Sequence, residues 1–275
     1  MSSKNKKHKN RNKMADTADK HVLYQKSVQC VEAEIDFIDE TFEQLRGRKA
    51  VKLREDFCGT MNTSCEWIRR RDDNIAYSVD LDEEVLDWGR KNNISELDPN
   101  QQLRIKPVHG NVLEVDLEPV DCILAMNFSY WILKERATLK QYFKKLYSDL
   151  VDDGILFLDC YGGYEAFQEL EESTRHKGFT YVWDQSSYNP ITGECTCYIH
   201  FKFKDGSKIE KAFTYHWRLW TLPELIDLLK ECDFSPVVYW EGTDEDGEGN
   251  GVFEPTTVGE ADAGWIAYIV CEKNR

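Results

Sequence analysis

The sequence contains no run of eighteen apolar residues, and no apolar segment follows its N-terminus. The first absence argues against a membrane-spanning helix, and the second argues against a secretory signal. With 275 residues, of which 41% are hydrophobic, the chain has enough apolar side chains for the core of one large domain. We therefore expect a soluble, cytoplasmic, globular protein.

A second close pair of cysteines is also missing. The nine cysteines are odd in number and scattered, which favours reduced, packed thiols over a disulfide framework. Cys195 and Cys197 form the one close pair and, two residues apart on a strand, they would lie on one face. No second pair completes a zinc site, so we expect no metal centre.

Basic residues are scarce outside the first residues of the chain. Residues 1–13 hold six of the 35 Lys and Arg and no acid, which leaves 29 basic against 50 acidic residues and a formal charge of −21 for the rest. This charge would repel a long phosphate chain and disfavours a nucleic-acid partner. Residues 1–15 are expected to form a disordered basic tail, either a solubilising segment, a nucleic-acid arm or a localisation signal.

The apolar patterns after the tail alternate between strand and helix. Apolar residues at helical spacing predict an N-terminal helical cap over residues 16–47, before the first strand. The pattern then predicts strands at 49–57, 75–81, 102–109, 121–128 and 155–161, with helices at 63–71, 83–92 and 136–150. Such alternation is typical of an α/β protein with a mostly parallel sheet and helices on both faces.

The pattern changes in the second half of the chain. Short alternating segments joined by turn residues predict an antiparallel β-meander over residues 179–215, within an insertion spanning about 164–215. A capping box beginning at Thr221 starts a further helix. Strands at 236–240 and 265–271 close the domain, which we expect to span residues 16–275. Between these strands, residues 241–251 read as an acidic, glycine-rich loop.

One segment carries most of the chemical information. The apolar strand that starts at Val51 ends in Glu55 and Asp56 and runs into the turn Cys58-Gly59-Thr60, ahead of a helix. The next strand ends at Asp80. A strand, tight turn and helix followed by a strand with a terminal acid is how α/β proteins bind a nucleoside, because the turn presents backbone N–H groups and the acid accepts the ribose hydroxyls.

These motifs resemble those of class I S-adenosylmethionine-dependent methyltransferases of the small-molecule type, over residues 49–160 and 216–271. In that family the first strand leads into a G-x-G-x-G turn. Here Gly59 matches the middle glycine, whereas Phe57 and Met61 take the places of the outer two. The resemblance implies a Rossmann-like, seven-stranded, mostly parallel sheet with the β-meander as an insertion on the substrate side.

The resemblance also implies the cofactor S-adenosylmethionine and a set of residues that hold it. Asp80 would bind the ribose and Leu81 would lie against the adenine, while the Asn111 amide oxygen would meet the adenine amino group. The acidic residues would attract the sulfonium and ammonium charges. Arg54 would bind a carboxylate, or else pair with a neighbouring acid. The full set of predicted cofactor-binding residues is Arg54, Glu55, Asp56, Cys58, Gly59, Thr60, Asp80, Leu81, Asn111, Val112, Asn127 and Phe128.

The aromatic residues at predicted strand ends indicate where an acceptor would enter. Tyr130 and Tyr161 are our candidates for the acceptor pocket, because ligands of parallel sheets sit at the carboxyl edge. His200 and His216 can each be packed, hydrogen-bonded histidines; if one is a catalytic base, His216 is the better candidate.

The sequence thus leads to one functional hypothesis and two alternatives. The hypothesis is a methyltransferase acting on nitrogen or oxygen of a small-molecule acceptor, with no metal. The alternatives are an RNA or protein methyltransferase, with residues 1–13 as a basic arm, and a non-catalytic protein that binds S-adenosylmethionine. The sequence does not indicate the oligomeric state.

Overall fold

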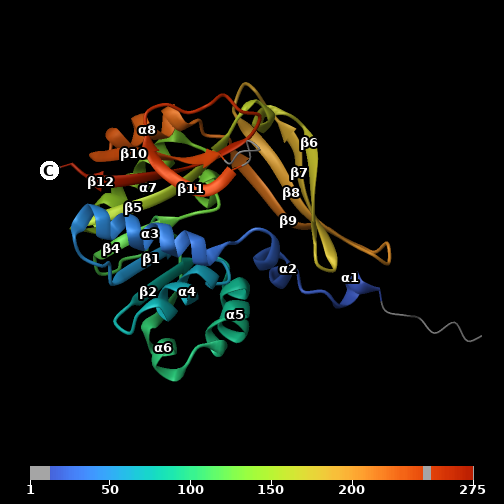
Figure 1. The fold of residues 1–275 in the computed structure, drawn as a ribbon, viewed down its shortest axis with the longest axis horizontal. Coiled ribbons are helices and arrows are strands. Elements are labelled where there is room, and N and C mark those ends of the chain that lie inside the picture. The colour runs from blue at the N-terminus through green and yellow to red at the C-terminus, as the bar shows by residue number, and fades with distance from the viewer. Residues whose placement is uncertain (1–12, 244–248, 275) are drawn as a thin grey trace, which may run out of the picture.

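A computed structural model describes residues 13–243 and 249–274. Its largest part is one sheet, shown in Figure 1. The strands of this sheet are β1 (Lys52–Asp56), β2 (Ile75–Asp80), β3 (Ile105–His109), β4 (Val120–Ala125), β5 (Leu150–Gly162), β10 (Phe234–Thr243), β11 (Gly249–Thr256) and β12 (Trp265–Lys273). Their order is β11-β10-β12-β5-β4-β1-β2-β3. Strands β1 to β5 pair in parallel, and β10 to β12 run antiparallel, so the mostly parallel sheet is confirmed.

The sheet differs from the prediction by one strand at its edge. The sequence predicted seven strands and a loop at 241–251, but β10 reaches Thr243 and pairs antiparallel with an eighth strand, β11. The apolar anchor of β11 is Phe253, whose ring stacks on Tyr268 at 4.2 Å between centroids. Residues 244–248 of the acidic loop lie outside the described residues.

Helices cover both faces of this sheet, as predicted. On one face lie α3 (Val31–Arg46), α4 (Asn62–Arg70) and α5 (Glu83–Asn92), and on the other lie α7 (Arg136–Asp149) and α8 (Leu222–Lys230). Strand β4 shows why the two layers form. Its side chains alternate, with Ile123 packing in the α7 core and Leu124 in the α3 core.

The predicted strand 102–109 is wrong in its first three residues. They belong to a short helix, α6 (Pro99–Arg104), and β3 begins only at Ile105. Asp98 and Gln101 form a capping box around Pro99, which starts the helix.

The insertion forms a second, antiparallel sheet between β5 and α8. Its strands, in spatial as well as chain order, are β6 (Leu170–His176), β7 (Phe179–Tyr188), β8 (Glu194–Phe203) and β9 (Lys208–Arg218). The predicted meander is confirmed, with β6 as an additional strand. Most β6 side chains are exposed, so this strand lacks the apolar alternation that reveals the other three.

The N-terminal helices connect the two sheets. The short α1 (Met14–Thr17) and α2 (Lys20–Ser27) cross from the inserted sheet to α5, whereas α3 is a layer helix of the main sheet (Figure 1). The backbone N–H of Met14 donates to Asp205 at 2.8 Å, so the chain is already ordered before the predicted tail boundary at residue 15. Residues 1–12 of that tail lie outside the described residues. Among the residues described, no helix is long and apolar enough to cross a membrane.

Candidate functional site

The turn after β1 follows the path of a glycine-rich loop although it contains one glycine. Phe57, Gly59 and Met61 have φ angles of 56°, 52° and 60°, which are left-handed values. A residue with a Cβ adopts this conformation at a cost of about 1–2 kcal/mol. The alternating left-handed positions that glycine favours are therefore present, and α4 begins directly after them.

Asp80 connects this turn to the end of β2. Its Oδ2 accepts from the Gly59 N–H at 2.7 Å, and its Oδ1 accepts from the Asp82 N–H at 2.9 Å. Each carboxylate oxygen has a second lone pair for a further donor. The neighbouring Leu81 is 68% exposed at the same edge of the sheet. The N-cap of α5 is Asp82, so the carboxylate of Asp80 is not needed there.

Four carboxylates with raised pKa values gather near this edge. Burial raises the pKa of Glu55 to about 8, that of Asp159 to about 8 and that of Glu34 to about 7, and it also raises the pKa of Asp80. The Glu34 charge adds to the shift of Glu55 and Asp159. Within the described part of the chain, none of the four forms a salt bridge. A buried negative charge without a cation is costly, so this region would stabilise a cationic ligand.

Glu34 and Asp159 are absent from the residues predicted from the sequence. Glu34 lies three residues after Val31 and four before Ile38, on the buried side of α3, and Asp159 interrupts the apolar strand β5. Their exposed fractions are 8% and 5%. An acid in an otherwise apolar, inward-facing stripe is the signal that could have found both.

Asp159 also fixes the end of β4. Its two carboxylate oxygens accept from the backbone N–H groups of Asn127, at 2.6 Å, and Phe128, at 2.9 Å. Both residues have left-handed backbones, with φ of 56° and 57°. Asn127 and Phe128, two of the predicted cofactor-binding residues, therefore lie in a backbone turn that a buried acid holds.

Tyr130 does not belong to the acceptor pocket. Its ring is fully buried, and its hydroxyl donates to the backbone oxygen of Asp159 at 2.7 Å. The short 3₁₀ helix Ser129–Ile132 turns the side chain into the core under β5. The prediction that Tyr130 lines the acceptor pocket is therefore corrected to a structural role.

Arg54 and Asp56 pair with each other instead of facing a ligand. The Arg54 Nε and Nη2 donate to the two Asp56 oxygens at 2.6 and 3.0 Å, and Nη1 reaches Asp149 at 2.5 Å. Tyr142 donates to Asp56 at 2.8 Å, and all of these contacts lie on the α7 side of the sheet. Because side chains alternate along β1, Glu55 points to the opposite side, where it accepts from the N–H and the hydroxyl of Ser64.

His216 is exposed on the outer side of the inserted sheet, where its Nδ1 lies 3.3 Å from the Thr196 hydroxyl. Its neighbours in sequence, Tyr215 and Trp217, point inward, and the strand alternation therefore turns His216 away from the pocket. The prediction of His216 as a base is wrong. His200 is the hydrogen-bonded residue that we expected, with Asp184 at 3.2 Å.

The other predicted cofactor residues lie around the turn. Thr60 is 8% exposed and accepts from the Gln25 side chain of α2 at 2.8 Å, and Cys58 is buried beside it. At the end of β3, the Asn111 amide oxygen accepts from the Leu113 N–H at 3.0 Å, and Val112 is buried. The amide oxygen of Asn111 retains one lone pair for a further donor.

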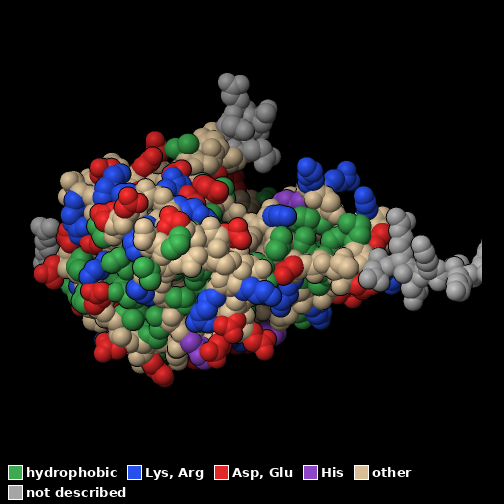
Figure 2. Space-filling model, turned by 90° about the horizontal axis from the view of Figure 1, so that it is seen from below, with side chains coloured by type: hydrophobic (Ala, Val, Ile, Leu, Met, Phe, Trp, Pro, Cys, Tyr) green, Lys and Arg blue, Asp and Glu red, His purple; other side chains and the backbone are tan. Residues whose placement is uncertain are grey.

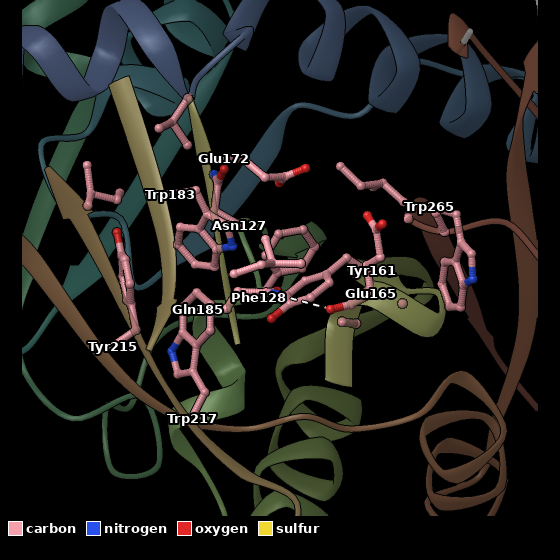
Figure 3. Close-up of a pocket in the computed structure, with 18 of the residues that line it drawn as sticks. Asn127, Phe128, Tyr161, Glu165, Glu172, Trp183, Gln185, Tyr215, Trp217 and Trp265 are labelled. Carbon is pink, nitrogen blue, oxygen red and sulfur yellow. Dashed lines mark hydrogen bonds between the residues drawn. The ribbon is translucent and has the colours of Figure 1, made fainter. Parts of the chain in front are cut away.

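A cavity of about 420 Å³ opens between the ends of β4 and β5, the inner face of the inserted sheet and α2 (Figure 3). Asn127, Phe128 and Tyr161 line it, and the role of Tyr161 in binding an acceptor stays a prediction. Its size lies in the range of small-molecule sites. The aromatic residues of its wall are Tyr24, Phe128, Tyr161, Tyr181, Trp183, Tyr215, Trp217 and Trp265, and its polar residues are Asn127, Glu165, Glu172, Gln185 and Glu241.

No protein-family model and no curated protein sequence matches the chain. Solved structures do, and they show that the chain has the fold of S-adenosylmethionine-dependent methyltransferases. One such enzyme from Clostridium acetobutylicum aligns with a TM-score of 0.71 at 15% identity, over 93% of this chain and 98% of that one. CalS10, an amino pentose methyltransferase from Micromonospora echinaspora, aligns at 0.66 and 14%, over 97% and 100%. The sugar N-methyltransferase KedS8 from a Streptoalloteichus species aligns at 0.62 and 16%, over 94% of each chain.

Proposed function

We propose that the protein is an S-adenosylmethionine-dependent methyltransferase that acts on nitrogen or oxygen of a small-molecule acceptor. The observation that carries this proposal is a group of four carboxylates at the carboxyl edge of the sheet, next to the aromatic cavity: those of Glu34, Glu55 and Asp159, which are buried, and that of Asp80, which is half-buried. S-adenosylmethionine carries a sulfonium and an ammonium, and these carboxylates can stabilise both positive charges without a metal. The shared fold supports the same cofactor, since CalS10 was solved with S-adenosylmethionine bound.

Each part of the site has a task in this proposal. Asp80 offers its free lone pairs to the ribose hydroxyls, the exposed Leu81 covers the adenine, and Asn111 meets the adenine amino group. When bound, the cofactor supplies an electrophilic methyl group. The backbone turn at Asn127 and Phe128 separates the two halves of the site and orients the acceptor toward that methyl.

Alignment and exclusion of water are the main catalytic contributions of this architecture. A methyl transfer is an in-line displacement, and correct positioning of the two reactants removes much of the entropic cost. The hydrogen bond from Gln25 to Thr60 holds α2 over the turn, and Tyr24 of α2 reaches the cavity wall. The N-terminal cap thus encloses the donor and the acceptor at once.

Surface charge supports a small acceptor over a polymer. On the face shown in Figure 2, acidic and basic side chains are interspersed. The formal net charge of the whole chain is −15. A nucleic-acid substrate would favour a continuous basic surface. The nine cysteines, eight of them buried and none in a disulfide, support a reducing compartment such as the cytoplasm.

Two measurements test the proposal. Calorimetry with S-adenosylmethionine and S-adenosylhomocysteine measures binding, and Asp80→Ala should weaken it about tenfold or more because a charged hydrogen-bond acceptor is lost. The exposed Asp73→Ala serves as the matched control. Small-molecule extracts incubated with enzyme and isotopically labelled methyl donor should yield a labelled metabolite. Binding without any labelled product would indicate a sensor, and label in RNA or protein would indicate a polymer substrate.

A further inference from the structure

The wall of the cavity on the inserted sheet contains three aromatic rings that face one space. Trp183 comes from β7, and Tyr215 and Trp217 come from β9. The ring centroids lie 4.4 Å apart for Tyr215 and Trp217, 5.9 Å for Trp183 and Tyr215, and 6.2 Å for Trp183 and Trp217. Figure 3 shows these side chains along one side of the cavity. Grouped aromatic faces of this kind attract alkylammonium groups.

The charged side chains of the cavity are all acidic. Glu165, Glu172 and Glu241 line it, and no Lys, Arg or His is among the described lining residues. Glu165 and Glu172 belong to no ion pair in the described ranges 13–243 and 249–274. An acceptor with a carboxylate or a phosphate would meet only repulsion here, whereas a cation would be attracted.

Glu165 is presented by a rigid turn. Its backbone N–H donates to the Ala263 oxygen at 2.9 Å, and its own backbone oxygen accepts from the Gln185 side chain at 2.9 Å. The preceding Gly163 has a φ of 106°, and a Cβ there would lie 2.3 Å from the Ala263 oxygen. The turn is therefore closely packed, and it fixes the backbone of Glu165 at the cavity.

The same wall offers no strong base to a hydroxyl acceptor, because its carboxylates can take a proton from an ammonium but are too weak to take one from an alcohol. An alcohol must lose its proton as the new bond forms, and that step needs a base. Burial raises the pKa of Tyr24 to about 12 and also raises the pKa values of Tyr161 and Tyr215, so these phenols stay protonated and neutral. A neutral amine already has the lone pair that attacks the methyl carbon.

We propose that the acceptor is a small amine with an apolar body, held by the aromatic faces of Trp183, Tyr215 and Trp217 and by the carboxylates of Glu165 and Glu172. This inference rests on the proposed function. The amine binds as its ammonium ion and first gives one proton to a lining carboxylate or to water, which frees the lone pair. The neutral nitrogen then forms a bond to the methyl carbon, the carbon–sulfur bond breaks, and its electron pair stays on sulfur. The nitrogen becomes a cation that the carboxylates stabilise, and it then releases a proton to one of them or to water.

The test compares matched acceptors on the full chain with S-adenosylhomocysteine bound. A panel of arylalkylamines and amino sugars is titrated beside the hydroxyl and carboxylate compounds of the same skeleton, with tryptophan fluorescence as the readout. We expect at least one amine to bind about tenfold more tightly than its hydroxyl counterpart. Glu165→Gln and Glu172→Gln should each reduce this preference, and Glu169→Gln, an exposed neighbour outside the cavity wall, should leave it unchanged.

Three results would overturn the inference: no amine binds, the hydroxyl or carboxylate compounds bind as well as the amines, or both Gln variants keep the full preference. Labelled methyl donor then separates this inference from the proposed function. Labelled ethers or esters without labelled amines would leave the methyltransferase in place and remove the amine acceptor. No binding of S-adenosylmethionine or S-adenosylhomocysteine would remove the proposed function itself.

Discussion

The side chain of Met61 occupies the space that Gly89 leaves open on α5. A Cβ on Gly89 would lie 2.7 Å from the Met61 Cε and 2.5 Å from the backbone oxygen of Thr60. Met61 stands where a glycine-rich loop would have its last glycine, and it is fully buried. The glycine that is missing from the turn is thus matched by a glycine in the helix opposite, and the turn keeps its path.

Gly89→Ala should therefore destabilise the protein. Alanine in place of a helix glycine usually stabilises by roughly 0.5–1 kcal/mol, but the clash with Thr60 and Met61 should reverse the sign to a loss of about 1–3 kcal/mol. Urea unfolding measures the difference, and cofactor affinity should fall with it because the turn must move. Lys91→Ala, on the exposed side of the same helix, is the control. An increase in stability for Gly89→Ala would show that the helix and the turn are not in contact.

The buried pair of Arg54 and Asp56 should matter for folding more than for ligand binding. Arg54→Met leaves the Asp56 carboxylate buried without its cation and should cost about 3–5 kcal/mol, measured by chemical denaturation. Arg90→Met removes an exposed pair with Asp87 and should change stability by less than about 1 kcal/mol. If the Arg54 variant is stable but no longer binds S-adenosylmethionine, the original prediction of a cofactor contact is right.

Cofactor affinity should rise with pH. The raised pKa values of Glu34, about 7, and of Glu55 and Asp159, about 8, mean that these groups are partly protonated at neutral pH. A cationic ligand favours the ionised carboxylates, so binding should release protons near pH 7 and become tighter between pH 6 and about pH 8, above which the ligand's own ammonium group loses its charge. Calorimetry in buffers of different ionisation enthalpy measures the protons released. S-adenosylhomocysteine, which lacks the sulfonium charge, should show a weaker dependence, and equal dependence for both ligands would contradict the expectation.

The same carboxylates make the unliganded protein less stable as the pH rises. Between about pH 4 and pH 8 the unfolded chain has lost these protons while the folded chain still binds them, so the free energy of unfolding decreases over this window and levels off above it. Thermal unfolding across this range should show the decrease. Glu55→Gln, which keeps an oxygen for the Ser64 N–H, should make the curve flatter. A curve with unchanged slope would mean that Glu55 is ionised in the folded protein.

Tyr130, Tyr161 and His216 should respond differently to substitution. Tyr130→Phe loses a buried hydrogen bond and should reduce stability by about 1 kcal/mol.

Tyr161→Phe alters the cavity wall and should change turnover with the acceptor more than cofactor affinity. His216→Gln should leave turnover unchanged, and a loss of turnover with normal folding would return His216 to the active site.

The sequence predicts the main sheet and the turn well because both depend on local patterns. The strand that ends at Asp56 and the acid at Asp80 follow from apolar runs and their termini. The alternation of side chains along a strand also places Glu55 and Asp56 on opposite faces, and it turns His216 away from Tyr215 and Trp217. Both arrangements could have been predicted by assigning a face to each residue. Other features depend on long-range contacts that no local pattern reveals. The charge of Glu34 acts on Asp159 only after α3 has packed against the sheet, and Met61 fits only because Gly89 is opposite.

The N-terminal helix α2 contacts the turn after β1 through the hydrogen bond from Gln25 to Thr60. Tyr24 of the same helix lines the aromatic cavity. The N-terminal helices also reach the tip of the inserted sheet, where Met14 binds Asp205. A truncated variant should therefore keep Lys13 and all residues after it. Under the proposed function, a cut beyond Ser27 would remove a support that the donor and the acceptor share, and methyl transfer would be lost although the Rossmann-like core was intact.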